Sequence, residues 1–116
     1  MEPIQSPVTD QTFLKTFTGG KEDKIKKYIG MFLDGAPGLL KQIDDHLASG
    51  DLALLRVAAH SLKPQLTYMG VKEEASHIYL IEKTAAEAAH AERLPELIAR
   101  LHQVCDQAFV ELRALM

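Results

Sequence analysis

The sequence is poor in cysteine, in long apolar runs and in positive charge, and each shortage excludes a class of protein. Its 116 residues include one cysteine, Cys105, which leaves no partner for an internal disulfide and no Cys-rich zinc site. No stretch approaches the roughly 18 apolar residues of a transmembrane helix, and residues 1–10 lack the pattern of a signal peptide. The net charge of −3 disfavours nucleic-acid binding. We therefore expect a cytoplasmic protein that binds neither membrane nor nucleic acid.

The composition suits one globular domain. Apolar residues make up 47% of the chain and charged residues 25%, close to the average of soluble domains. The length fits a single domain and leaves no room for a second. Pro3 and Pro7 mark residues 1–9 as a flexible lead-in, so we expect residues 10–116 to form the domain.

Apolar side chains recur every three or four residues along the rest of the chain, which is the spacing of amphipathic helices. A short helix is expected after Asp10, ending at Gly19-Gly20, and Asp51 is a plausible N-cap for a later helix. The longer helices are predicted over about 21–48, 52–69, 72–89 and from Leu94 onward. The predicted fold is all-α: an antiparallel up-down four-helix bundle with a short additional N-terminal helix.

One helix leaves two structures open. Pro37 removes a backbone donor and crowds the carbonyl of Leu33, which favours a break after the first half of the second helix. A kinked but continuous helix is the alternative. Both keep the apolar faces on the same side.

His60 is the most informative residue. On a helical wheel it lies opposite an apolar stripe formed by Leu55, Ala58, Leu62, Leu66 and Met69. The residues beside it on the wheel are Arg56, Lys63, Pro64 and Thr67. A neutral imidazole is a nucleophile, and Lys63, one turn away, can place its ammonium near a phosphoryl group on His60. A surface histidine is more often merely solvated, so the wheel alone assigns no role.

The segment Ala59-His60-Ser61-Leu62-Lys63, followed by Gly70, resembles the signature of histidine-containing phosphotransfer (HPt) domains. That signature is Ala-His-x-Leu-Lys with a glycine ten residues after the histidine. The chain length, the helical pattern and a proline-bearing second helix also resemble the family, over about residues 10–115. The resemblance implies that His60 accepts a phosphoryl group from a receiver-domain aspartate and passes it to another receiver. Lys63 is then its charge partner, and Gly70 ends the helix.

One position departs from the family pattern. Many members have glycine after the lysine, whereas this chain has Pro64. Proline has no N–H, so the carbonyl of His60 loses its helical donor and the helix should bend there. Thr67 is near enough along the helix to supply a donor instead.

The resemblance also implies a set of partners. The domain would be a monomeric phosphocarrier in a two-component phosphorelay, with neither a nucleotide site nor kinase activity. Its partners would be response-regulator receiver domains and a hybrid sensor histidine kinase. The receiver would supply the Mg²⁺, so no cofactor or metal is expected here. The docking rim is predicted to consist of Arg56, Pro64, Thr67 and Val71, with the proline and the valine as apolar anchors.

Two other classes share some of these features. A helical adaptor that binds its partner without phosphorylation has the same composition and periodicity, and acid-labile phosphate on the protein would distinguish the two. A dimerising histidine-kinase helix pair predicts a two-helix hairpin, and the chain has too many helices for that. The remaining histidines, which show no i, i+4 pair and so predict no metal site, are His46, His77, His90 and His102. Cys105 lies on the apolar seam of the last helix and is predicted to be buried.

Overall fold

Helices make up most of the chain in the computed structural model, which describes residue 4 and residues 6–116. The long helices are α2 (Glu22–Ser49), α3 (Leu52–Tyr68), α5 (Ile78–Glu87) and α6 (Leu94–Arg113). The short elements are α1 (Thr12–Thr18), α4 (Glu73–Ser76) and the 3₁₀ turn η1 (Ala91–Arg93). No strand occurs in the described residues. The all-α prediction is confirmed.

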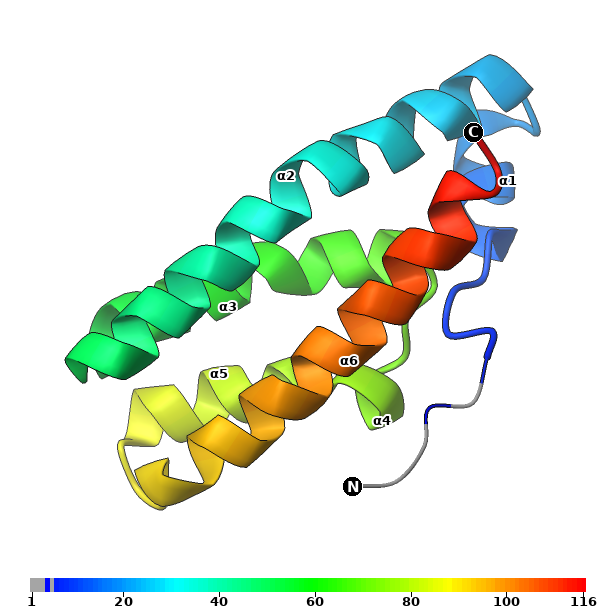
Figure 1. Cartoon of the computed structure of the whole chain (residues 1–116). Coiled ribbons are helices and arrows are strands. Elements are labelled where there is room, and N and C mark those ends of the chain that lie inside the picture. The colour runs from blue at the N-terminus through cyan, green and yellow to red at the C-terminus, as the bar shows by residue number, and fades with distance from the viewer. Residues whose placement is uncertain (1–3, 5) are drawn as a thin grey trace.

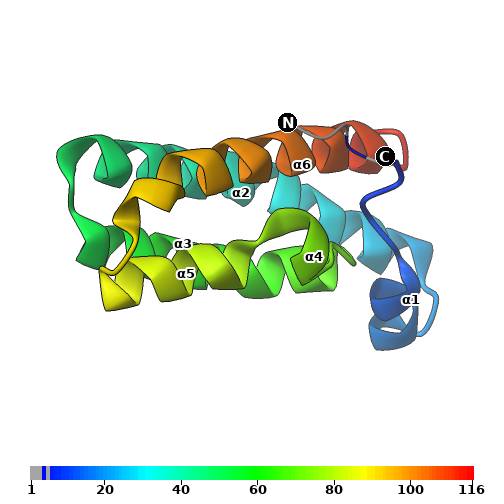
Figure 2. The same ribbon diagram turned by 90° about the horizontal axis from the view of Figure 1, so that it is seen from below.

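The four long helices form two layers, with α2 and α6 in one and α3 and α5 in the other (Figure 1, Figure 2). Contacts between α2 and α3, α3 and α5, α5 and α6, and α6 and α2 close the bundle. Successive long helices run in opposite directions (Figure 1). The arrangement agrees with the predicted up-down bundle, and α1 packs against the start of α2 as the additional N-terminal helix.

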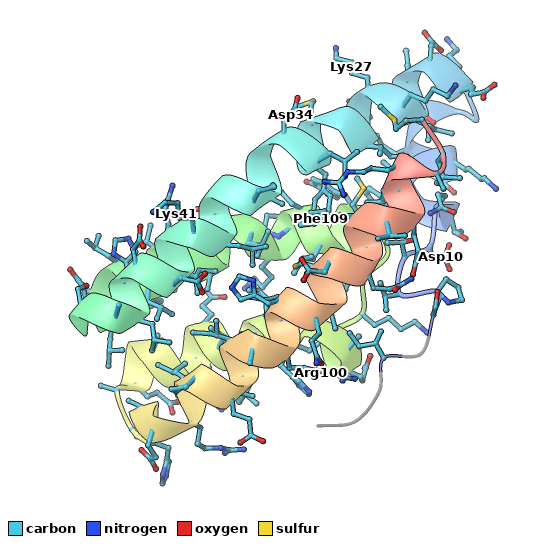
Figure 3. The ribbon with its side chains drawn as sticks, in the orientation of Figure 1. Asp10, Lys27, Asp34, Lys41, Arg100 and Phe109 are labelled. Atoms are coloured by element: carbon cyan, nitrogen blue, oxygen red, sulfur yellow. The ribbon has the colours of Figure 1, made fainter. Side chains whose placement is uncertain are left out.

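Each helix turns an apolar face inward and a charged face outward. Figure 3 shows Lys27, Asp34 and Lys41 pointing away from the bundle along α2. On the inner side, the ring of Phe32 lies 5.6 Å from that of Phe109 in α6, centroid to centroid. The bundle is therefore held mainly by burial of apolar side chains, at roughly 1.5–3 kcal/mol for each large one.

Helix α2 continues through Pro37, which resolves the open alternative in favour of a continuous helix. The carbonyl of Leu33 loses its intrahelical donor, because proline has no N–H. The apolar face nevertheless continues on both sides of the proline, where Phe32, Ala36 and Leu40 are buried. Burial of the two larger side chains offsets the roughly 3 kcal/mol that a proline costs inside a helix.

Helix α3 has well-defined ends. At its start Oδ1 of Asp51 accepts a hydrogen bond from the amide of Leu54 at 3.0 Å, so the predicted N-cap is confirmed. At its end Gly70 has a left-handed backbone with φ 76°, and the amide of Val71 donates to the carbonyl of Leu66 at 2.9 Å. This pattern pairs a carbonyl that the end of a helix leaves free.

The helix predicted over 72–89 is interrupted at His77, which separates α4 from α5. His77 has a left-handed backbone with φ 55°, a conformation that cannot continue a helix. The carboxylate of Glu73 accepts hydrogen bonds from the amides of Tyr79 at 2.8 Å and Leu80 at 3.3 Å. It thereby satisfies amides that the first turn of a helix leaves free. The prediction of one continuous helix here is wrong.

The second half of the lead-in is fixed to α6. Residues 1–3 and 5 lie outside the described residues, but Val8 and Thr9 both donate to the carboxylate of Glu111. Its oxygens lie 2.9 Å from the amide nitrogen of Val8, 3.0 Å from that of Thr9 and 2.6 Å from the Thr9 hydroxyl. Burial raises the pKa of Glu111, but these hydrogen bonds and one from Gln107 lower it to about 2. Val8 and Thr9 are thus hydrogen-bonded to α6, a contact that the predicted flexible lead-in over residues 1–9 did not include.

Candidate functional site

His60 lies at the middle of α3 and points out of the bundle. Its side chain is 64% exposed, whereas Leu62 and Leu66 on the other face of the helix are buried. The outward position that the helical wheel predicts is confirmed. A partner protein can therefore reach the imidazole without any change in the bundle.

One carboxylate on the neighbouring helix holds both His60 and Lys63. Glu82, in α5, places Oε1 at 2.6 Å from Nδ1 of His60 and Oε2 at 2.8 Å from Nζ of Lys63. The Glu82 side chain is only 14% exposed. Nζ of Lys63 also lies 5.5 Å from the ring centroid of Tyr79, within the range of a cation–π contact. We call these three residues the His60–Glu82–Lys63 cluster.

Glu82 is ionised at neutral pH. Burial raises its pKa, but hydrogen bonds from Lys63 and His60, together with the charges of both, outweigh burial and lower the pKa below its ordinary value. The carboxylate and the Lys63 ammonium then cancel, so the cluster is electrically neutral when His60 is neutral. Lys63, the predicted charge partner of a phosphoryl group, is thus already paired with the carboxylate of Glu82.

Sequence reasoning missed Glu82, although one signal pointed to it. The residue follows the buried Ile81 and lies one turn from the buried Ile78 and Ala85, at the edge of an apolar stripe. A carboxylate in such a position normally has a partner, because leaving it unpaired would be costly. The identity of that partner depends on how α3 packs against α5, which the periodicity of either helix does not contain.

Three of the four predicted rim residues are exposed: Arg56, Pro64 and Thr67. The fourth, Val71, is only 6% exposed and belongs to the core, so its prediction as a docking anchor is wrong. Val71 lies beyond the end of α3, where Gly70 turns the chain inward. A helical wheel does not apply past that point.

Thr67 makes a different hydrogen bond from the one suggested by the sequence. Its hydroxyl donates to the carbonyl of Lys63 at 3.2 Å, four residues back along the helix. The suggestion that Thr67 satisfies the carbonyl of His60 is therefore wrong. The physical reason is that a threonine in a helix bonds most readily to the carbonyl of the preceding turn.

An exposed group of stacked aromatic rings continues from the rim. The ring of Phe13 stacks between those of Phe17, at 5.9 Å, and Tyr68, at 5.3 Å. Phe13, Phe17 and Tyr68 are 42%, 61% and 46% exposed, respectively, which is high for large apolar residues. We call these three residues the aromatic strip. Tyr68 directly follows Thr67, so the strip adjoins the rim, a relation between α1 and α3 that the sequence pattern did not reveal.

The contact between His102 and Asp44 and the thiol of Cys105 lie outside the His60–Glu82–Lys63 cluster. Nε2 of His102 lies 2.8 Å from Oδ1 of Asp44, which links α6 to α2. Cys105 is fully buried, as predicted. Burial, and to a smaller extent the negative charge of Asp106, raise the pKa of its thiol to about 12. Among the described residues no three His, Cys, Asp or Glu side chains are grouped to hold a metal ion.

None of the helices in the described part of the chain has the length and apolar character needed to cross a membrane.

Known proteins share this fold. The Hpt domain family matches residues 27–111, a range that includes His60, Lys63 and Glu82. Histidine-containing phosphotransfer protein B from Pseudomonas aeruginosa PAO1 has a similar structure, with a TM-score of 0.83 and 23% sequence identity over 95% of both chains. This likeness concerns the fold. No curated protein sequence matches the chain.

The family match over more than half of the chain and the shared bundle fold together define the class of protein. The chain belongs to the Hpt domain family. Its function is histidine phosphotransfer in a phosphorelay.

Proposed function

We propose that His60 carries the phosphoryl group. The observation that supports this assignment is the exposed imidazole of His60, fixed from behind by Glu82, within the region that matches the family. The side chain is open to a partner on one side and held by the bundle on the other. Such an arrangement suits in-line transfer, which depends mainly on positioning and charge neutralisation.

In the proposed reaction the donor is a phosphoaspartate of a receiver domain. A ring nitrogen of His60 forms a bond to phosphorus, while the bond between phosphorus and the aspartate oxygen breaks. The electron pair of that bond leaves with the aspartate carboxylate. Transfer onward to a second receiver reverses these bond changes at a new aspartate.

Lys63 is proposed to offset part of the charge on the phosphoryl group. Its ammonium shares a carboxylate with His60, which places it beside the imidazole before any phosphoryl group arrives. The receiver supplies the Mg²⁺ and its acidic ligands, so this domain contributes the nucleophile and the docking surface. It is a phosphocarrier without a nucleotide site and without kinase activity of its own.

Arg56, Pro64 and Thr67 form the proposed docking rim for the receiver, and the aromatic strip extends it with apolar area. Aromatic residues are common at the energetic centre of protein interfaces. A hybrid sensor histidine kinase is the proposed source of the phosphoryl group. In this proposal the domain acts as a monomer in the cytoplasm.

Incubation of the protein with phosphorylated receiver domains tests the assignment. The wild-type chain should acquire acid-labile phosphate, and His60→Gln should acquire none while keeping its helical circular dichroism spectrum. His90→Gln, which changes an exposed histidine outside the cluster, should be labelled like wild type. Labelling of His60→Gln would place the phosphate on another histidine. Receiver binding without any labelling of wild type would instead favour a helical adaptor.

A further inference from the structure

We infer that Glu111 is a positioning residue for receiver docking: it fastens the segment before α1 to α6 and thereby holds the aromatic strip beside the docking rim. This inference rests on the proposed function, in which the rim and the strip bind the receiver. Glu111 lies on α6, whereas the rim lies on α3 and the strip on α1 and α3. It acts on the interface through the segment of chain that it anchors.

Residues 6–10, which we call the strap, are fastened to α6 mainly through one carboxylate. Oε1 of Glu111 accepts hydrogen bonds from the amide and the hydroxyl of Thr9, at 3.0 and 2.6 Å. Oε2 accepts from the amide of Val8 at 2.9 Å and from the hydroxyl of Ser6 at 3.2 Å. Hydrogen bonds to an ionised carboxylate are stronger than those between neutral groups. Glu111 therefore fixes the path of the strap along α6.

The strap leads directly into α1, which lies at the same end of the bundle as the last turns of α6 (Figure 1). The amide of Asp10 donates to the carbonyl of Met69, beyond the end of α3, at 3.0 Å. Oδ1 of Asp10 accepts a hydrogen bond from the amide of Thr12, the first residue of α1, at 2.8 Å. Because Asp10 directly follows Thr9, a shift of the strap is transmitted to both contacts. The strap thus sets where α1 begins relative to α3.

Helix α1 is too short to hold its position by itself. It has seven residues, and isolated helices shorter than about 12 residues are marginal in water. Its buried residues are Leu14 and Thr18, whereas Phe13 and Phe17 present exposed rings. The ring of Phe13 stacks on that of Tyr68 in α3 at 5.3 Å, so the strip forms only while α1 lies against α3. The anchored strap keeps it there.

A loosened strap weakens docking through an ordering cost. If α1 is no longer fixed, the receiver has to order it on binding, and ordering a segment at an interface opposes association. His60 lies in the middle of α3, which the strap contacts only beyond its end, so the imidazole keeps its position. Glu111 should therefore affect the binding of the receiver and leave the transfer step within the complex unchanged.

Glu111→Gln in the full chain is the direct test. Both carboxylate oxygens face N–H donors, Oε1 that of Thr9 and Oε2 those of Val8 and Gln107, so the glutamine NH₂ group meets a donor in either orientation. The dissociation constant for a receiver domain should rise about three-fold or more. The rate of phosphoryl transfer at saturating receiver should stay unchanged. Glu96→Gln removes an exposed carboxylate from the same helix and should match wild type in both measurements.

A double-mutant cycle shows whether the effect passes through the strip. Phe17→Ala removes an exposed ring of the strip and should by itself lower receiver affinity. In that background Glu111→Gln should have a clearly smaller effect than in wild type, because part of the contact that the strap positions is already lost. Equal effects in the two backgrounds, or unchanged affinity in Glu111→Gln, would overturn the positioning role.

A measurement without any receiver separates this inference from the proposed function. Nuclear Overhauser effects between the rings of Phe13 and Tyr68 should be weaker in Glu111→Gln than in wild type or Glu96→Gln. Unchanged intensities would overturn the link between Glu111 and α1, even if receivers bind. If the intensities fall but Phe17→Ala leaves affinity unchanged, or no receiver binds wild type, the proposed docking role of the strip fails, and the role of Glu111 in docking fails with it.

Discussion

The backbone of Asp10 lies directly against Gly70. The amide of Asp10 donates a hydrogen bond to the carbonyl of Met69 at 3.0 Å, which brings the residue before α1 onto the end of α3. A Cβ atom on Gly70 would collide with the backbone nitrogen and carbonyl oxygen of Asp10. Gly70 also has φ 76°, in the region that side chains disfavour. Two independent constraints thus require glycine at this position.

Gly70→Ala should therefore lower the free energy of unfolding by about 2 kcal/mol or more. The left-handed backbone alone costs roughly 1–2 kcal/mol for a residue with a Cβ, and the displaced Asp10 backbone adds to that. Urea denaturation measures the change. Gly38→Ala is the control, because a Cβ at this position would meet nothing within 4 Å. Gly38 lies inside α2, where alanine should leave the stability of the protein unchanged or raise it by up to about 1 kcal/mol. Equal stability of the two variants would contradict the steric argument.

Glu111 should make stability depend on pH in acid. Its pKa is about 2 in the folded chain against an ordinary 4.5, so the unfolded chain takes up a proton first as the pH falls. The stabilisation is complete above about pH 4.5 and is lost as the pH falls toward 2. Thermal unfolding over this range should show a steeper decline for wild type than for Glu111→Gln. At pH 7 the substitution should cost about 1–2 kcal/mol.

Glu96→Gln provides the matched control, because Glu96 is exposed on the same helix. Its stability should follow the wild-type curve. A Glu111→Gln curve parallel to wild type between pH 4.5 and 2 would mean that the contacts to Val8 and Thr9 do not stabilise the fold.

Lys63→Ala should reduce both stability and phosphotransfer. The sequence suggests a change of about 0.5 kcal/mol or less, because the residue lies on the polar flank of its helix. The structure shows Lys63 paired with the largely buried Glu82, so we expect a loss of about 1 kcal/mol in chemical denaturation. The transfer rate should fall or the phosphohistidine lifetime should change. Lys83→Ala changes an exposed lysine on α5 and should alter neither stability nor phosphotransfer. An unchanged transfer rate and phosphohistidine lifetime in Lys63→Ala would exclude the electrostatic role of Lys63.

Pro64→Ala should weaken receiver binding more than it alters folding. A proline inside a helix costs about 3 kcal/mol relative to alanine, but α3 continues past Pro64 with Leu62 and Leu66 buried on either side. We therefore expect a gain of only about 1 kcal/mol or less in thermal stability. Receiver affinity should fall because the exposed ring is removed from the rim. Pro37→Ala, in α2 outside the rim, should leave affinity unchanged. A large stability gain with unchanged affinity would show that Pro64 is a tolerated defect.

The helices and the outward position of His60 could be predicted because both follow from local periodicity. Buried apolar side chains recur along each long helix. Asp51 marks the start of α3 through a hydrogen bond to a residue only three positions away. The break at His77 could not be predicted in this way. The break depends on the left-handed backbone of His77, a residue other than glycine, and on the hydrogen bonds of the Glu73 side chain. Neither feature alters the spacing of apolar residues in the sequence.

The errors at the site concern residues whose positions cannot be predicted from the periodicity of one helix. Val71 is buried because the chain turns at Gly70. A helical wheel of α3 therefore does not predict the direction of its side chain. Glu82 reaches His60 from 22 residues away through the packing of two helices. Tertiary contacts of this kind are set by the combined shapes of both faces, which no one segment specifies.

The attachment of Val8 and Thr9 to Glu111 has a consequence for the order of folding. These contacts span 103 and 102 residues, so the closure entropy of nearly the whole chain opposes them until the bundle has brought the two segments together. They should therefore form last and be the first to open. Amide hydrogen exchange would then be faster at Val8 and Thr9 than in the cores of α3 and α6, and this opening would leave the four-helix bundle intact.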